Sequence, residues 1–321
     1  MPKTGDVLSL LQVDGTVTGS FAQITFPQLL PGFQVSTKFE GGVYKVTALN
    51  DAVLAPTFLL NISTRMQVGT GDNVLIGGFI LQGSEPKRMM IRAIGPSLEA
   101  AGVEGSLADP TLELHNGTGA LIATNDDWQA TETGSVITED QVAEIQATTI
   151  APLSEFESAI VATLAPGAYT AIVAGASETG GVGLAEVYDL GPAAVPTKLA
   201  NISTRGFVQT GDNVMIGGFI IGNQTTQVLV RGIGPSLAVA GVSGVLADPT
   251  LELHDSNGAL IASNDNWKDT QQAEIEATGI PPNDDLESAI LATLDPGAYT
   301  AIVRGVGNAT GVGLIEAYGL D

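Results

Sequence analysis

The strongest constraint in this sequence is an internal repeat. The segment 61–79, NISTRMQVGTGDNVLIGGF, returns at 201–219 as NISTRGFVQTGDNVMIGGF, and the two copies then match to the end of the chain. One insertion in the first copy, around 130–142, shortens the offset from 140 to 130 residues. Such a period is the size of a domain, far above the roughly 20 to 50 residues of solenoid repeats. We therefore expect each copy to fold as its own unit.

The repeat divides the 321 residues into four parts. These are a strand-rich N-terminal segment at 1–57, a first repeat at 58–191, a linker at 192–198 and a second repeat at 199–321. The linker region reads GPAAVPTK. Because proline restricts its own φ and the residue before it, this linker is expected to be extended and stiff, and the two repeats to sit end to end.

Apolar residues in each repeat alternate with polar ones or form short blocks such as VLIGGFIL, TLELH, SAIVATL and AYTAIVA, bounded by Gly, Pro, Asn and Asp. This pattern predicts roughly seven or eight strands per repeat, with one short helix near 140–147 and its counterpart near 270–277. Two packed sheets are the economical way to bury so many half-apolar strands. We predict an all-β fold: two tandem, jelly-roll-like β-sandwich domains after a short strand-rich segment.

The segment 6–49 reads as about four short strands, with Asp14-Gly15 and Gly41-Gly42 in hairpin positions. So few strands without a helix make a marginal independent domain. We expect the segment to pack on the first repeat or on a neighbouring molecule, where it would act as an assembly strand.

The formal charge of −23, from 35 acidic and 12 basic residues, excludes a nucleic-acid backbone as a natural partner and disfavours anionic membranes. Divalent cations or a need for solubility fit that charge better. No apolar run reaches about 18 residues, so no membrane span is predicted. The chain has no cysteine, which rules out disulfides and thiolate metal sites. Its start, MPKTGDVLSL, lacks signal-peptide features, so we expect either a cytoplasmic chain or an export signal lying outside it.

The blocks NISTR, GDNVLIGGF, IRAIGPSL, LADPTLELH, NDNW, ESAI and PGAYTAIV together resemble a repeated module near the C-terminal ends of large secreted proteins of environmental bacteria. The resemblance covers about 58–321. The part 248–299, with DPTLEL, Gly258, NDN and PGAY, is also loosely similar to the bacterial pre-peptidase C-terminal type of β-sandwich. Residues 6–49 resemble the segment that closes β-helical stalks in such proteins. These resemblances imply an extracellular or cell-surface accessory or structural role.

The strongest candidate site is a hard-cation site. The loops TNDDW, 124–128, and SNDNW, 263–267, follow strands, and a glutamate opens a later strand of each repeat. Calcium takes six to eight oxygen ligands, which these side chains and nearby carbonyls could supply. The candidate ligands are Asp126, Asp127 and Glu157 in the first repeat and Asp265, Asn266 and Glu287 in the second. Asp109-Pro110 and Asp248-Pro249 could join them. The alternative is an Asx-turn before a packed tryptophan.

A catalytic site is not predicted. The two histidines, His115 and His254, occupy the same repeat position at the end of TLELH, and the sequence has no G-x-S-x-G elbow and no P-loop. A hydrolase would require one of these histidines to line a pocket beside a nucleophile. We expect both to be structural or surface residues, and the protein not to be an enzyme.

Arginines recur inside apolar strands and must find acceptors if buried. For Arg92 and Arg231 the expected partners are Glu113 and Glu252, and structural ion pairs are also expected for Arg65 and Arg205. The NISTR context matches the N-glycosylation acceptor pattern, which makes Asn61 and Asn201 candidate glycan sites. Trp128, Trp267, Tyr169 and Tyr299 are the recurrent large aromatics that could stack on sugars, with core packing as the favoured alternative.

Together these features predict a non-catalytic extracellular structural protein that self-associates through its N-terminal strands, as a filament or surface layer. Strand addition to a neighbouring sheet would supply the contact. The alternative is a carbohydrate- or surface-binding accessory module of a larger secreted enzyme or adhesin.

Overall fold

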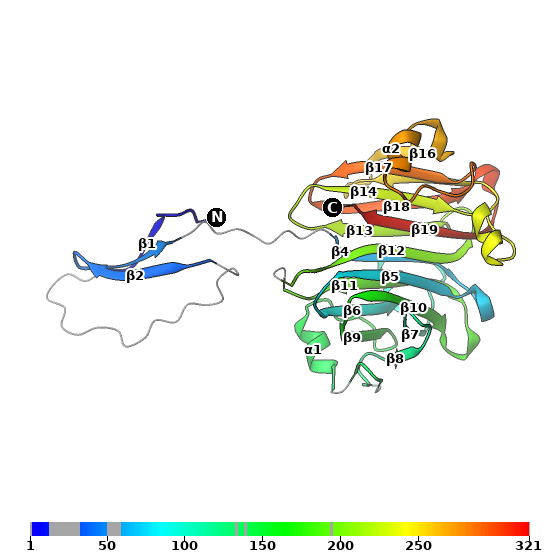
Figure 1. Ribbon diagram of the computed structural model, residues 1–321. Helices are drawn as coiled ribbons and strands as arrows, with labels where there is room; N and C mark the ends of the chain where they lie inside the picture. Colours follow the sequence, from blue (N-terminus) through cyan, green and yellow to red (C-terminus); the bar gives the residue numbers. More distant parts are fainter. Residues whose placement is uncertain are drawn as a thin grey trace. The chain divides into compact units, whose positions relative to one another are not determined.

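The computed structural model describes residues 2–12, 33–49, 59–131, 134–137, 140–192 and 195–320. The chain divides into two compact units, Met1–Pro56 and Thr57–Asp321 (Figure 1). Both are built from antiparallel strands, and the helices of the described residues are short. The prediction of an all-β fold is confirmed. None of the described helices is long and apolar enough to cross a membrane.

The first unit contains a three-stranded antiparallel sheet in the order β1 (Val7–Gln12), β3 (Val43–Ala48), β2 (Val35–Glu40). Strands β2 and β3 form a hairpin around Gly41 and Gly42, whose φ values are 61° and 78°. Two consecutive positive φ angles suit a tight hairpin turn, and glycine adopts them without strain, so this predicted turn is confirmed. The other predicted turn, Asp14-Gly15, lies outside the described residues.

Each repeat of the second unit contributes eight strands. In the first repeat they are β4 (Leu59–Val68), β5 (Leu75–Gly83), β6 (Lys87–Ile94), β7 (Pro110–Asn116), β8 (Leu121–Asn125), β9 (Ser158–Leu164), β10 (Gly167–Gly175) and β11 (Gly181–Asp189). In the second they are β12 (Thr197–Val208), β13 (Met215–Ile221), β14 (Thr226–Ile233), β15 (Pro249–His254), β16 (Leu260–Asn264), β17 (Ser288–Leu294), β18 (Gly297–Gly305) and β19 (Gly311–Gly319).

Short helical segments join these strands. The α-helices are α1 (Val142–Ala147) and α2 (Gln272–Ala277), which occupy the two predicted helical positions. The 3-10 turns are η1 (Gly71–Asn73), η2 (Pro96–Ala101), η3 (Ala176–Glu178), η4 (Pro235–Ala240), η5 (Trp267–Asp269) and η6 (Val306–Asn308).

The strands of each repeat form two layers. In the first repeat the layers are β9-β6-β11-β4 and β8-β7-β10-β5, and the second repeat pairs its corresponding strands in the same way. Contacts of β6 with β7 and of β8 with β9 bring the layers together, and the residues between them are apolar and buried. Each repeat therefore has the sandwich layout that its alternating pattern predicts.

The layers continue from one repeat into the other. Strand β4 pairs with β13 of the second repeat, and β12 pairs with β5 of the first. The result is two long antiparallel runs, β9-β6-β11-β4-β13-β18-β15-β16 and β17-β14-β19-β12-β5-β10-β7-β8. Arg65 lies opposite Ile216 in one run, and Arg205 lies opposite Ile76 in the other. Arg205 is the repeat equivalent of Arg65, and Ile76 is the repeat equivalent of Ile216. The two pairings are therefore the same, and the exchange of strands between the repeats is symmetric.

Equivalent residues meet where the two repeats join. The hydroxyls of Thr64 and Thr204 are 2.8 Å apart, both fully buried, and Leu59 pairs with Leu199. A contact between a residue and its own counterpart is the mark of a two-fold, isologous interface. Strands β4 and β12, which carry these residues, lie side by side in the middle of the unit (Figure 1).

The expectation that each repeat folds on its own, with the two placed end to end, is therefore corrected. The repeats share both sheets and one continuous apolar core, and together they form a single compact unit. Separate domains would leave the edges of β4, β5, β12 and β13 without partners, and exposed edges of this kind are a hazard that folded proteins avoid. The predicted linker is also shorter than expected, because β12 begins at Thr197.

Candidate functional site

Glu157, a predicted calcium ligand, is used by the fold instead. Its side chain is fully buried, and one carboxylate oxygen accepts the backbone N–H groups of Gly95 (3.1 Å) and Ser97 (2.9 Å) and the Ser97 hydroxyl. The other oxygen accepts the N–H of Ser154 at 3.2 Å. A carboxylate with this many donors has little capacity left for a cation. Glu157 therefore fastens the start of η2 to the loop before β9.

Glu287 plays the same part in the second repeat. It is fully buried and accepts the N–H groups of Gly234 (3.1 Å) and Ser236 (2.9 Å) on one oxygen. Its other oxygen accepts the N–H groups of Asn283 (3.1 Å) and Asp284 (3.2 Å). The assignment of both glutamates as calcium ligands is corrected, because these backbone donors already surround the carboxylates.

The aspartates of the predicted loops do approach one another. Burial, and then the nearby Asp127 carboxylate, raises the pKa of Asp109, and burial followed by Asp265 raises the pKa of Asp248. One carboxylate oxygen of Asp109 and one of Asp248 are buried and accept no hydrogen bond from the described residues, and the same holds for the side-chain oxygen of Asn266. Asp126 is exposed. The Asp-Pro turns thus face the predicted loops, as the cation hypothesis requires.

No metal centre with three such groups is assembled, however. Across the described parts of the chain, no cluster of three or more His, Asp or Glu side chains is placed to hold a metal ion. The calcium hypothesis is thereby reduced to a carboxylate pair in each repeat, and it stays a prediction.

The two histidines lie at equivalent places and are held by the same kind of partners. His115 Nε2 is 2.8 Å from a Glu113 oxygen and its Nδ1 is 3.2 Å from the Gly119 carbonyl. His254 makes the matching contacts with Glu252, at 3.1 Å, and with the Gly258 carbonyl. In the second repeat Arg304 also donates to Glu252, at 2.9 Å. Both ring nitrogens of each histidine are therefore engaged, and neither ring is hydrogen-bonded to a hydroxyl of the described residues.

The arginines inside apolar strands find different partners from those expected. Arg92 pairs with Glu186 rather than Glu113, and its guanidinium lies 5.0 Å from the ring centre of Tyr188. Arg231 pairs with Glu316 in the same way, and not with Glu252. Strand β11 lies next to β6 in the sheet, with Glu186 opposite Arg92, whereas Glu113 lies on a strand of the facing layer. The burial of Tyr188 and the Glu186 charge raise the pKa of the tyrosine above its ordinary range.

The two tryptophans proposed for sugar stacking pack inside the protein. Trp128 and Trp267 are 6% and 4% exposed and donate their indole N–H to the carbonyls of Ser154 and Asp284. They lie with the buried Ile145 and Ile275 of helices α1 and α2, in small clusters on the outer face of the sheets. Core packing is thus confirmed for both rings.

Tyr169 and Tyr299 also pack against aromatic neighbours. Tyr169 stacks on Phe79 and Tyr299 on Phe219, with ring centres 5.4 and 5.6 Å apart. The candidate glycan-attachment residues Asn61 and Asn201 are 5% and 4% exposed, so neither presents its amide to solvent in the folded protein.

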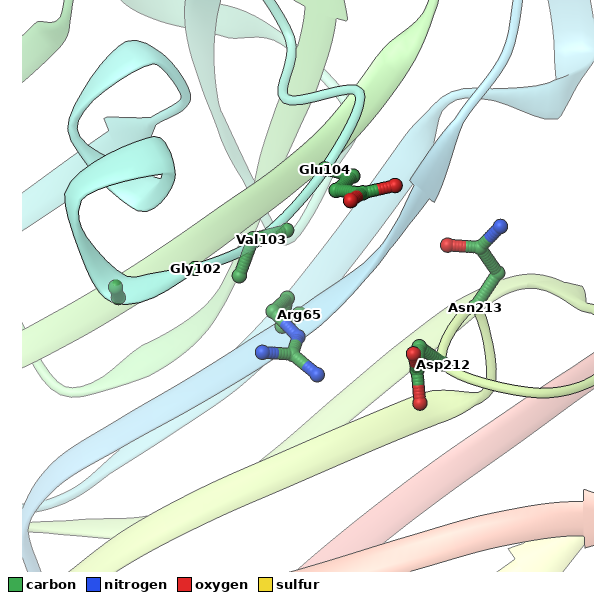
Figure 2. Close-up of a pocket in the computed structure, with 7 residues that line it drawn as sticks. Arg65, Gly102, Val103, Glu104, Asp212 and Asn213 are labelled. Carbon is green, nitrogen blue, oxygen red and sulfur yellow. The ribbon is translucent and has the colours of Figure 1, made fainter.

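A polar pocket that the sequence did not single out opens on the outer side of β4. Its volume is about 460 Å³, and its lining residues are Arg65, Ala101, Gly102, Val103, Glu104, Asp212 and Asn213. The Arg65 guanidinium lies between the segment Gly102–Glu104 on one side and Asp212 and Asn213 on the other (Figure 2). The first wall follows η2 of the first repeat, and the second belongs to the β12–β13 turn of the second. The pocket therefore exists because the repeats exchange strands.

The charged groups of this pocket are not used by the fold. Within the described residues, Arg65, Glu104 and Asp212 form no ion pair and no side-chain hydrogen bond. The expected structural ion pair for Arg65 is therefore absent from the described part of the molecule, and the same holds for Arg205. The signal that could have found the pocket is the joint repetition of NISTR and TGDN, since strand exchange brings the arginine of one copy to the turn of the other.

Comparison with known proteins finds no matching family model and no matching curated protein. Among solved structures, a DUF4785 family protein from Legionella pneumophila is similar at 11% identity and a TM-score of 0.24, covering 92% of this chain and 70% of that one. The group B streptococcus pilus 2b backbone protein is similar at 12% identity and a TM-score of 0.15, covering 80% and 90%. At these scores neither similarity supports a functional argument.

Proposed function

We propose that this protein is a non-catalytic structural protein of the cell surface or extracellular space, and that it self-associates through the sheet of its first unit. The observation that carries the proposal is strand β1. It lies at the edge of the sheet, and its large apolar side chains are exposed: Val7 by 55%, Leu8 by 62%, Leu10 by 50% and Leu11 by 44%.

An exposed apolar edge strand is an open template for another strand. Among the described residues β1 pairs with β3 alone, and none of them pairs with its other side. The described hydrophobic residues buried in this unit are Val46 and Ala48, which is little apolar burial for an independent domain. A second copy that added a strand to β1 would satisfy the backbone groups and cover the leucines. If that contact is heterologous, it does not close and produces a filament.

Charge also favours this contact. Residues 1–56 contain three lysines and four acidic residues, a net charge of −1, although the whole chain carries −23. Two copies of the second unit repel each other, while the first unit can approach another copy at little electrostatic cost. Electrostatic repulsion between two copies is therefore smallest when they meet at the N-terminal unit.

The non-catalytic part of the proposal is supported by the histidines. Each is hydrogen-bonded to a glutamate and a backbone carbonyl rather than to a nucleophile. The alternative function, a carbohydrate-binding module, is weakened because two of its four candidate stacking residues, Trp128 and Trp267, are buried.

The test compares the full chain with the double variant Leu8→Lys/Leu10→Lys, using light scattering on a sizing column and negative-stain electron microscopy. Wild type is expected to form multimers or filaments, and the double variant to run as a monomer, because two charges on the exposed strand oppose its burial. Ser9→Lys, a polar position on the same strand, is the matched control and should still assemble. A monomeric wild type at about 100 μM, or a double variant that assembles equally well, would overturn the proposal.

A further inference from the structure

The Arg65 pocket combines one positive and two negative groups that the fold leaves without partners. Opposite Arg65 in the sheet lie the apolar side chains of Leu184 and Ile216, both half-buried. Arg65 is thus flanked by apolar residues on both neighbouring strands, and its guanidinium lies in the pocket (Figure 2). A charged group that is partly removed from water gains most when a partner of opposite sign reaches it.

The arrangement of the charges selects the ligand. A guanidinium offers a fixed fork of donors that matches a carboxylate bidentately. Glu104 and Asp212 are acceptors, which an ammonium group satisfies with its three donors. A simple anion would meet Arg65 but also two carboxylates, and a simple cation would meet the carboxylates but also Arg65. A molecule with both groups avoids both repulsions.

We propose that this pocket binds a small zwitterion of the α-amino acid class, with its carboxylate on Arg65 and its ammonium group between Asp212 and Glu104. The volume of about 460 Å³ lies within the usual range for small-molecule sites. The excess of one negative charge in the lining favours a basic amino acid. This activity is independent of self-association through the first unit.

The repeat supplies a second set of the same residues. On β12, Arg205 lies opposite Ile76 as Arg65 lies opposite Ile216, and the turn before β5 carries Asp72 and Asn73. The glycines that shape the walls are also repeated, with Gly102 and Gly241 at φ of 81° and 82°. These left-handed positions end η2 and η4 and turn the following residues toward the sheet.

One difference separates the two sets. Ser243 occupies the position of Glu104, so the Arg205 set lacks the second carboxylate. We therefore expect two sites per chain, with the Arg65 site the tighter one for both amino acids and the difference between the sites larger for a basic amino acid.

The experiment is isothermal titration calorimetry of the full chain with L-lysine and with glycine. Arg65→Ala should weaken the tighter lysine site by about tenfold or more, the loss expected for a charge-assisted bidentate contact. Arg65→Ala/Arg205→Ala should weaken both sites by about the same factor. Glu104→Ser should lower the affinity of the first site for both amino acids, because Glu104 faces the α-ammonium group, and more for lysine, which carries a second positive charge. Arg88→Ala, at a half-buried arginine that pairs with Glu144 outside the pocket, is the control for loss of an arginine and should bind as wild type does.

Ligands that carry only one of the two charged groups, or neither, complete the test. Acetate, methylammonium and glucose should each bind at least about tenfold more weakly than glycine, because each satisfies part of the lining. Melting temperatures of all variants confirm that they are folded. The proposal is overturned if neither amino acid binds at millimolar concentration, if the double arginine variant binds as wild type does, or if glucose binds as well as glycine.

Discussion

Replacing Glu157 with glutamine tests whether this buried carboxylate is a structural clamp or a cation ligand. The change keeps the shape of the side chain and removes its charge. In the protein the carboxylate accepts backbone N–H groups from Gly95, Ser97 and Ser154 and the Ser97 hydroxyl. A glutamine oxygen can keep the cluster around Ser97, but the amide NH₂ then meets the N–H of Ser154, and two donors face each other.

The magnitude follows from these contacts. Hydrogen bonds to a charged acceptor contribute about 1.5–3 kcal/mol and neutral ones about 0.5–1.5, while an unsatisfied buried donor costs about 1–3 kcal/mol. The lower cost of burying a neutral amide offsets part of the loss. We expect the free energy of unfolding to fall by about 2–4 kcal/mol. For a unit of this size, that lowers the melting temperature by about 4–12 °C.

The assay is thermal and urea unfolding of the full chain with excess calcium and with chelator. Glu155→Gln is the matched control, since Glu155 is exposed two residues away, and it should melt within about 1 °C of wild type. The loss for Glu157→Gln should be the same with calcium and with chelator. A variant that is as stable as wild type refutes the clamp, and a loss that appears solely in calcium restores Glu157 as a ligand.

Two further predictions concern the join between the repeats and the paired aspartates. Thr64→Val should lower the free energy of unfolding by about 1–3 kcal/mol, because it leaves the buried Thr204 hydroxyl without its partner. The double variant Thr64→Val/Thr204→Val should be nearly as stable as wild type. If urea unfolding shows that the two single losses add, the hydrogen bond between the two hydroxyls is contradicted. Because the folded pKa of Asp109 is raised, stability falls as pH rises from the unfolded value of 3.8 through the folded one. Asp109→Asn should therefore melt higher than wild type at pH 7 and equally near pH 3. If the Asp109–Asp127 pair binds calcium, the ion should stabilise wild type alone. A lower melting temperature of the variant at pH 7 without calcium would refute the cost of burying the Asp109 charge beside Asp127.

Local sequence determined much of this architecture. The period-2 alternation in each repeat specifies which side chains face the core, and so it predicts the strands and their inner faces. Gly41-Gly42 predicts a hairpin because few other residues adopt two consecutive positive φ angles.

The partners of the strands could not be read in this way. Backbone hydrogen bonds are the same for every residue, so alternation in β4 fits pairing with β5 of its own copy or with β13 of the other equally well. Alternation also fails to predict which outward-facing residues of a strand are covered. In β6, Met90 and Arg92 lie on the outer side of the sheet and are still covered, because α1 and its loop pack over them.

The sequence by itself thus determined the duplication, the all-β class and the inner face of each strand, since these follow from local periodicity and turn chemistry. The tertiary structure alone decided that the two copies exchange strands, that Glu157 and Glu287 point at backbone amides, and that Arg65 of one copy lines the same pocket as Asp212 of the other. The physical reason is that each of these outcomes depends on which segments, far apart along the chain, share one sheet edge, and no local pattern encodes that choice.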